Sequence, residues 1–468
     1  MLSAFALLSL ALLPTQDAAS VSPAAPLTLS QRVDSERAAA WVRSLVECGP
    51  RMGGTPSGAL AAEFLEKTFK NMGLATQVIE GPEKRVYWEE PWTMVAHLGA
   101  TDSLAAEELT LHQAWPYGFA PSAAGTWPLS LETKAGTVLL SEGVHRPKRK
   151  GPKLGAALVD GHCTKLGGWP KLVPMRGTSQ NAYPVIGIGS KNGAQLRSWL
   201  AAGRSVEIEL ELTTTVTRAR PLTVEASIPA APGSPPGVFI LCAHGDSDAG
   251  GPGANDNASG VAVVLSIAAA WQAAIKDGSL PAPPREVRFV IWGSEIHSTR
   301  HYLDEHLKDV PCVGVINYDQ AGYGSGAEQL NIEPDDLPAN IGLVRSLYDL
   351  CSERDGTDGF PKRWATNKSL GGTDSYVFSS SKLFRNGGIP AVTVFTSAWD
   401  KPEDHPRSEG MPGESWRSRD QVGVDFDHYY HSAGDRPELT TDLEAHNLGW
   451  CARVGFLGAL GWLDALEN

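Results

Sequence analysis

The sequence predicts an α/β fold in which helices cover both faces of a mixed, mainly parallel sheet and a β-rich domain is inserted. Beyond residue 218, apolar strand-like runs alternate with helical segments, a pattern that favours a parallel sheet. Residues 95–217 contain many short strand candidates broken by Gly and Pro. The 468 residues exceed the usual size of one domain, so we expect a main domain at 30–94 and 218–468 and an insert at 95–217.

Local sequence patterns predict the individual elements. Apolar residues recur with helical periodicity over 35–74, and a Gly- and Pro-containing turn at 48–55 divides this stretch into two helices. In the insert, the patterns predict strands at 136–140, 183–188 and 205–212 and a helix at 190–203. In the second part of the main domain they predict strands at 238–243, 286–292, 313–318 and 389–395, and helices at 259–274, 298–307, 343–351 and 441–466.

Composition narrows the classes of partner. Hydrophobic residues make up 42% and charged residues 20%, which is typical of a soluble globular protein. The formal net charge is −13, and the chain has no long basic run. We therefore expect neither nucleic acid nor an anionic membrane surface as a partner.

The N-terminus predicts export. An apolar run that is too short to span a bilayer is followed by Pro14 and a small, polar stretch, as in a secretory signal. No Lys or Arg precedes this run, although secretory signals usually carry one. We expect residues 1–25 to be a signal and leader and the protein to be secreted or periplasmic, with no other membrane contact.

Side chains that bind metals or protons follow the predicted strands. His244 ends the first of these strands, Glu295 follows the second and Asp319 follows the third. Asp256 lies in a Gly-rich segment that opens a helix, and His431 lies near the C-terminus. Because ligands of such sheets bind beyond the carboxyl ends of the strands, we expect these side chains to meet at one edge.

The types of these side chains indicate zinc chemistry. The six cysteines are scattered without a CxxC pair, which argues against a zinc–thiolate site. Imidazole and carboxylate are the ligands that zinc accepts in place of thiolate. A carboxylate can bridge two metal ions, and a free carboxylate beside them can take a proton from water. Asp246, two residues after His244, can orient the imidazole ring.

These segments resemble the co-catalytic zinc exopeptidases, which include bacterial leucyl aminopeptidases, glutamate carboxypeptidase and carboxypeptidase Q. The most specific segment is Gly-Ala-Asn-Asp-Asn-Ala-Ser-Gly at 253–260. The resemblance also rests on His244-x-Asp246, Glu295, Asp319, Thr373-Asp374, Gly388-Ile-Pro-Ala391 and Tyr430-His431-Ser-x-x-Asp435. It covers 220–468 well and 35–90 more loosely, where Arg51-Met-Gly-Gly-Thr55 matches an early turn of the family. The insert is placed like the protease-associated domain of the carboxypeptidase Q type.

The resemblance implies a role for each residue. Asp256 would bridge two zinc ions, with His244 and Asp319 completing one site and His431 belonging to the other. Glu295 would be the general base, and Asp246 would orient His244. Tyr430 or Asp374 would line the substrate site. The implied substrate is a peptide, and the implied cofactor is zinc, with two ions expected and one as the alternative.

One departure from the family leaves three interpretations open. The family carries two adjacent glutamates after the second strand, first the base and then a zinc ligand, whereas this chain reads Ser294-Glu295-Ile296-His297. Isoleucine cannot bind zinc. In the favoured interpretation Glu295 is the base and His297 supplies the lost ligand. Alternatively, Glu295 is the ligand and Ser294 stands at the base position, or one metal site is weak or empty.

The leading functional hypothesis is a metal-dependent aminopeptidase or dipeptidase that acts on small peptides outside the cytoplasm. The alternatives are a single-zinc acyl transferase of the glutaminyl cyclase kind and a non-catalytic peptide-binding protein that kept the fold. Metal content and hydrolysis separate these hypotheses.

Overall fold

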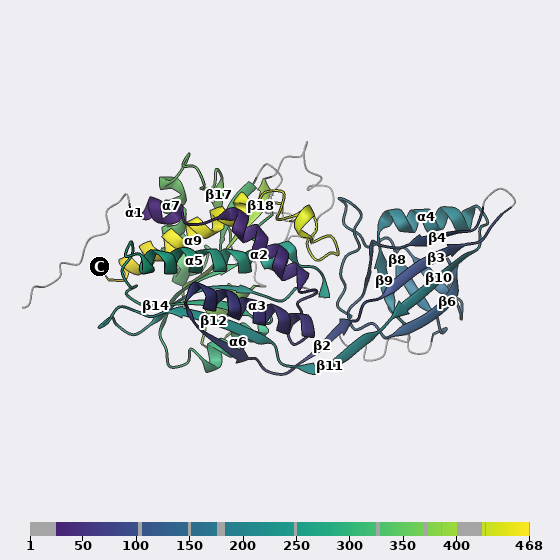
Figure 1. The fold of residues 1–468 in the computed structure, drawn as a ribbon, viewed down its shortest axis with the longest axis horizontal. Helices are drawn as coiled ribbons and strands as arrows, with labels where there is room; N and C mark the ends of the chain where they lie inside the picture. The colour runs from purple at the N-terminus through teal and green to yellow at the C-terminus, as the bar shows by residue number, and fades with distance from the viewer. Residues whose placement is uncertain are drawn as a thin grey trace, which may run out of the picture.

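The computed structural model describes residues 25–101, 105–147, 151–175, 183–247, 250–323, 328–368, 373–384, 386–399, 424–425 and 427–467. The expected signal at 1–25 lies outside these residues except for residue 25. The described residues form two β-sheets joined by a two-stranded ribbon (Figure 1). One sheet carries the candidate site, and the other forms the insert.

The main domain is built on a nine-stranded sheet with the order β1-β12-β14-β13-β15-β18-β16-β17, in which β19 pairs with β18. Its strands are β1 (Ala75–Glu80), β12 (Leu222–Ile228), β13 (Val238–His244), β14 (Glu286–Trp292), β15 (Cys312–Tyr318), β16 (Glu328–Glu333), β17 (Trp364–Thr366), β18 (Ala391–Trp399) and β19 (Val424–Asp425). The four neighbours β14, β13, β15 and β18 run parallel. The strands β1 and β12 on one side, and β16 on the other, pair antiparallel. The expected fold class is therefore confirmed, with its parallel part at the centre.

Most residues of the central strands β13, β14 and β15 are apolar because helices cover both faces of the sheet. On one face, alternate residues such as Phe239 and Leu241 pack in one buried cluster with helices from distant parts of the chain. These helices are α1 (Ala25–Ser30), α2 (Ser35–Glu47), α3 (Pro56–Met72), α5 (Gly260–Lys276), α7 (Ile341–Glu353) and α9 (His446–Ala465). On the other face, Ile240 and Val290 pack with α6 (His297–Glu305) and α8 (Asp374–Ser379). Short helical turns lie at Ala254–Ser259 (η2), Pro338–Asn340 (η3) and Pro437–Leu439 (η5).

The helix α5 is the central helix of this layer. Together with η2 it forms a helical stretch, Ala254–Lys276, that is long and apolar enough to cross a membrane by composition. However, 78% of its apolar window is buried inside the protein. Its side chains lie in the cluster that joins α2, α3 and α9 to the sheet, so burial in the core accounts for its composition.

The described part of the insert contains an eight-stranded sheet with the order β4-β3-β10-β6-β7-β8-β9-β5 and the helix α4 (Ser190–Ala201). Its strands are β3 (Thr93–Leu98), β4 (Glu107–Thr110), β5 (Ala114–Pro116), β6 (Ala123–Ser130), β7 (Val138–Ser141), β8 (Ala156–Val159), β9 (Val185–Ile188) and β10 (Val206–Leu212). It has a hydrophobic cluster of its own, which includes Leu158, Leu196 and Ile208. The expected boundaries, 95 and 217, fall within β3 and within β11 of the ribbon.

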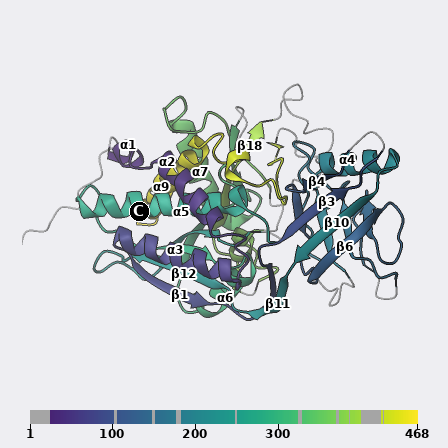
Figure 2. The same cartoon turned by 45° about the vertical axis from the view of Figure 1, so that its right-hand side comes forward.

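An antiparallel ribbon joins the two parts of the molecule. It consists of β2 (Lys84–Glu89) and β11 (Thr214–Ala219), and Figures 1 and 2 show it running from the main sheet to the insert. In both views the C-terminal segment before α9 lies beside the loops of the insert. The insert is therefore attached to the main domain both through its ribbon and through these loops.

We predict that close packing between α9 and β15 makes Gly455 intolerant of a side chain. A Cβ atom at Gly455 would overlap the hydroxyl group of Tyr318, which is fully buried. Gly455→Ala should therefore lower the free energy of unfolding by about 1–3 kcal/mol through overpacking.

A matched control lies in the same helix. At Gly461 the nearest atom to an added Cβ is the Ser346 hydroxyl oxygen, at 3.8 Å. Gly461→Ala should therefore be neutral or stabilising by up to about 1 kcal/mol, because alanine favours the helix. Thermal and denaturant unfolding of both variants measures the difference. Equal stability of the two variants would show that the contact at Gly455 does not constrain the packing.

Candidate metal centre

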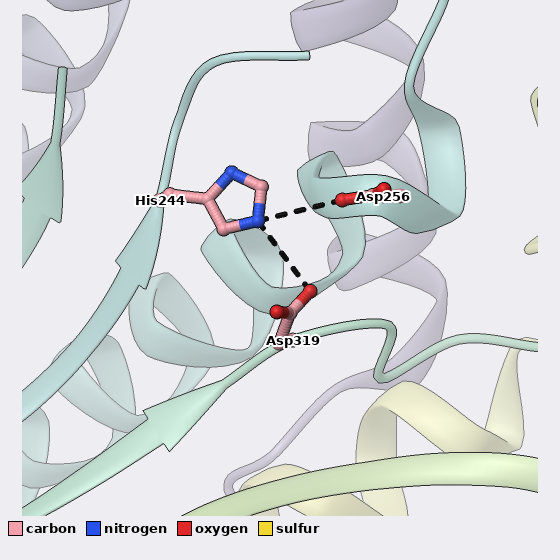
Figure 3. A group of neighbouring side chains, drawn as sticks. All are labelled: His244, Asp256 and Asp319. Carbon is pink, nitrogen blue, oxygen red and sulfur yellow. Dashed lines mark ion pairs between the residues drawn. The ribbon is translucent and has the colours of Figure 1, made fainter. Parts of the chain in front are cut away.

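Two parallel strands deliver the first two residues of the site. His244 is the last residue of β13, and Asp319 directly follows β15. These strands are neighbours in the sheet and run in the same direction, so both side chains emerge at the same edge. Both are buried, with 4% and 3% of their surface exposed. Asp256 reaches this edge from η2, the turn that opens α5 (Figure 3).

His244, Asp256 and Asp319 form a compact cluster. The Nε2 atom of His244 lies 3.4 Å from Asp256 Oδ1 and 3.4 Å from Asp319 Oδ1. One ligand atom from each residue lies within 4.8 Å of the other two, so a single metal ion can contact all three (Figure 3). The structure thus brings together three residues that are separated by up to 75 positions in the sequence.

The second oxygen of Asp256 faces another imidazole. Asp256 Oδ2 lies 3.1 Å from His431 Nε2, while Oδ1 faces His244. Burial alone would raise the pKa of Asp256, but the two imidazoles outweigh burial and the pKa falls below its usual range. A carboxylate with one imidazole at each oxygen has the arrangement that bridging of two metal ions requires.

The chemistry of the cluster fits zinc. Asp319 Oδ2 accepts a hydrogen bond of 2.7 Å from Thr373, whereas the buried Oδ1 has no hydrogen-bond donor among the residues that the structure describes. This unsatisfied oxygen faces the cluster, where a cation would satisfy it. Imidazole nitrogen and carboxylate oxygen are zinc ligands. The six cysteines are all free thiols, and none belongs to the group.

A carbonyl group fixes the ring of His244. Its Nδ1 lies 3.0 Å from the main-chain oxygen of Asp246, which can only accept, so Nδ1 carries a proton and Nε2 is the nitrogen that would offer a lone pair to a metal ion. The Asp246 carboxylate lies slightly farther away, at 3.4 Å, and accepts a hydrogen bond of 2.9 Å from the Glu295 main-chain N–H. Asp246 thereby links the ring of His244 to the segment of Glu295.

Glu295 lies just beyond β14 and faces the same charges. Burial raises the pKa of its carboxyl group well above the usual value; His244 opposes this shift, and Asp319 and Asp374 add to it. A divalent cation in the cluster would counteract the neighbouring carboxylates and favour the ionised form, which a general base requires. The preceding residue, Ser294, is buried and accepts a hydrogen bond of 2.5 Å from the Lys84 ammonium group.

The structure does not bring His297 into the cluster. Its Nε2 lies 3.0 Å from the carbonyl oxygen of Pro82, on the segment that leads into the ribbon. The backbone at Ile296 has a φ of 55°, and its N–H donates to Asp374 at 2.7 Å, so His297 begins α6 facing this segment. Substitution of the lost ligand by His297 stays a prediction, which this hydrogen bond disfavours.

The two expected substrate-binding residues lie in different surroundings. The ring of Tyr430 stacks on the ring of His431, with centroids 3.6 Å apart and an interplanar angle of 25°. Asp374 is fully buried, and its Oδ1 accepts hydrogen bonds from Ile296 N–H and the Thr299 hydroxyl. Burial raises the pKa of Asp374 to about 6. Asp374 therefore holds the start of α6, whereas Tyr430 accompanies a cluster residue.

Arg51 stabilises the loops of the site, a role that sequence reasoning missed. Its side chain is buried, and its guanidinium group donates to the carbonyl oxygens of Pro252 at 2.8 Å, Gly253 at 2.6 Å and Gly245 at 3.2 Å. These carbonyls belong to the loops that follow His244 and precede Asp256. The family resemblance includes the turn that contains Arg51, but the sequence carries no signal for the distant partners of this side chain.

Asp435 is a second buried support. Its two oxygens accept hydrogen bonds from the main-chain N–H groups of Asn255 at 2.7 Å and Asp256 at 2.9 Å. Burial raises the pKa of Asp435 to about 7, although these two hydrogen bonds oppose the shift. The carboxylate thus caps the turn that presents Asp256 to the two imidazoles.

A small cavity adjoins the cluster. It is lined by Gly253, Asp256, His431, Ser432 and Asp435 of the main domain and by Leu172 of the insert. The insert therefore contributes a residue to the immediate surroundings of the site.

Known proteins are similar to this chain in sequence and in structure. The profile of peptidase family M28 matches residues 224–453. Probable leucine aminopeptidase 2 of Aspergillus oryzae is 27% identical over 272 residues, which cover 54% of this chain and 47% of that protein. Probable lipoprotein aminopeptidase LpqL of Mycobacterium tuberculosis is 34% identical over 124 residues, which cover 26% of this chain and 22% of that protein. The chain thus spans about half the length of the first relative and less of the second.

A solved structure shares the fold. The zinc aminopeptidase BSAP from Bacillus subtilis has a TM-score of 0.55 at 18% identity, and the superposition covers 92% of this chain and 96% of that chain. Coverage this extensive includes most of the insert as well as the main sheet. Residues 224–453, which contain His244, Asp256, Asp319 and His431, are thus similar in sequence to peptidase family M28.

Proposed function

We propose that this protein is a zinc-dependent aminopeptidase that removes N-terminal residues from small peptides. The observation that carries the proposal is the Asp256 carboxylate, which faces His244 with one oxygen and His431 with the other while Asp319 completes the cluster. The similarity to peptidase family M28 and to aminopeptidases supports peptide hydrolysis in particular.

The chain supplies a proton carrier beside the cluster. Zinc held by His244, Asp256 and Asp319 would supply polarisation of the scissile carbonyl and a lowered pKa for water. Glu295 takes the proton of the attacking water and delivers it to the leaving amine. Ser294 is a poor candidate for this role, because a hydroxyl group that accepts from Lys84 is not a base at neutral pH.

The two halves of the centre are unequal. His244, Asp256 and Asp319 provide three ligands, which suffice for a catalytic zinc ion with an open position. On the His431 side, Asp256 Oδ2 and His431 provide two, and Ile296 stands where the family has its glutamate. We infer one tight site and a second, weaker one.

Export is part of the proposal. The apolar run near the N-terminus supports it, and the name of the mycobacterial relative describes a lipoprotein. We therefore propose that the enzyme meets its peptides outside the cytoplasm.

We expect Glu295→Gln to abolish most of the activity without removing zinc. The amide keeps the shape of the side chain but cannot take a proton, so kcat should fall by roughly 10²–10⁴-fold. Hydrolysis of aminoacyl p-nitroanilides and zinc content by atomic spectrometry test this. Glu353→Gln, at an exposed position at the end of α7, is the matched control and should leave both unchanged. Full activity of Glu295→Gln would disprove the assigned base.

We expect His297→Ala to keep the zinc affinity of the wild type, because His297 bonds to the Pro82 carbonyl rather than to the cluster. Asp319→Asn should weaken the tight site at least tenfold, since it replaces a charged ligand. Calorimetric titration of the metal-free proteins with Zn²⁺ measures both. Loss of a zinc equivalent in His297→Ala would establish His297 as the substitute ligand.

The same preparations separate the alternative functions. Chelator-sensitive release of N-terminal residues supports the aminopeptidase. Cyclisation of N-terminal glutamine with one zinc ion would indicate an acyl transferase instead. A wild-type protein that binds no zinc and hydrolyses no peptide would be a binding protein, and the proposed function would be wrong.

A further inference from the structure

The insert pairs with the loop that carries His431. Lys171 and Ser432 form an antiparallel β-bridge. The N–H of Leu172 donates to the carbonyl oxygen of His431 at 2.8 Å, and the N–H of Ala433 donates to the carbonyl oxygen of Pro170 at 2.9 Å. Two main-chain hydrogen bonds therefore connect segment 169–172 of the insert to segment 431–433 of the main domain.

Side chains reinforce this pairing. Leu172 and Ala433 form a small buried cluster, against which Trp115 and Trp169 pack. The guanidinium group of Arg436 lies 5.3 Å from the centre of the Trp169 ring, a cation–π contact. The contact combines hydrogen bonds, apolar packing and a cation–π pair, so it is a specific interface between insert and main domain.

The backbone of His431 has an unfavourable conformation that the contact with the insert stabilises. His431 has a φ of 51°, in the left-handed region that residues with a Cβ rarely adopt. Within the same loop, the N–H of Ser432 donates to the carbonyl oxygen of Tyr429 at 3.0 Å and closes a turn. The carbonyl of His431 is fixed from outside the main domain, by Leu172. The insert therefore stabilises a backbone conformation that would otherwise be unfavourable.

We infer that segment 169–172 of the insert positions His431 within the metal centre. It holds the loop so that His431 Nε2 faces Asp256 Oδ2, and it places Leu172 on the wall of the adjoining cavity. The inference rests on the proposed function in requiring that the cluster binds zinc. Residues 169–172 are positioning residues, since no metal-ligating side chain lies among them.

Proline isolates the contribution of the hydrogen bond. Leu172→Pro removes the N–H that holds His431, whereas Leu172→Ala removes the leucine side chain and keeps the N–H. Loss of a residue that orients a metal ligand typically weakens metal affinity by roughly 10–100-fold. We therefore expect Leu172→Pro to bind zinc about tenfold more weakly than Leu172→Ala does. Its zinc affinity should be close to that of His431→Ala.

The measurement is calorimetric titration of each full-length variant with Zn²⁺, with competition by a chelator where binding is tight. Circular dichroism and thermal unfolding establish that each variant is folded. Equal zinc affinity of Leu172→Pro and Leu172→Ala would overturn the inference. An unchanged affinity in His431→Ala would also overturn it, because His431 would then hold no metal. A wild type that binds no zinc would refute the proposed function itself.

If Leu172→Pro does not fold, a second pair of variants tests whether the insert positions His431. Trp169→Phe keeps an aromatic ring under Arg436, and Trp169→Leu removes it. We expect Trp169→Leu to weaken zinc binding severalfold and Trp169→Phe to preserve it. Equal affinity of both with the wild type would show that the insert does not position His431.

Discussion

Asp256 and Asp319 place two carboxylate groups within 3.4 Å of a single imidazole, in a site where both are more than nine-tenths buried. Carboxylates without water or cations around them are costly to bury. Glu295, Asp374 and Asp435 add further acidic groups close by, and their raised pKa values express the same cost. The nearby histidines and Arg51 offset part of this charge, and a divalent cation would offset the rest.

The residues around the cluster fix the positions of its charged side chains. Arg51 holds the carbonyl groups of the loops on either side, and Asp435 holds the main-chain N–H groups of the turn at Asp256. The ring of His244 is fixed through Nδ1. Each of these contacts leaves the atoms that face the cluster available, so the site is organised by its main chain as much as by its ligands.

The sheet and the positions of its site residues could largely be predicted from the sequence, because both depend on short segments of the chain. The strands that end at His244, Trp292 and Tyr318 are mostly apolar, and neighbouring parallel strands bring their carboxyl ends to one edge of the sheet regardless of the chain between them. The roles of Arg51 and Leu172 depend on pairs separated by about 200 and 260 residues, for which one sequence carries no signal. The direction of His297 depends on the φ of Ile296, which residue type alone does not reveal.

The family profile begins at residue 224 and contains all four cluster residues, yet two of the contacts described above originate upstream of it. Arg51 comes from the turn between α2 and α3, and Leu172 comes from the insert. The segment that matches the family profile is therefore shorter than the part of the chain that forms the candidate site. Replacing the insert with that of a relative would therefore also replace some of the contacts that surround the metal centre. The insert is not a domain that can be exchanged without an effect on the site.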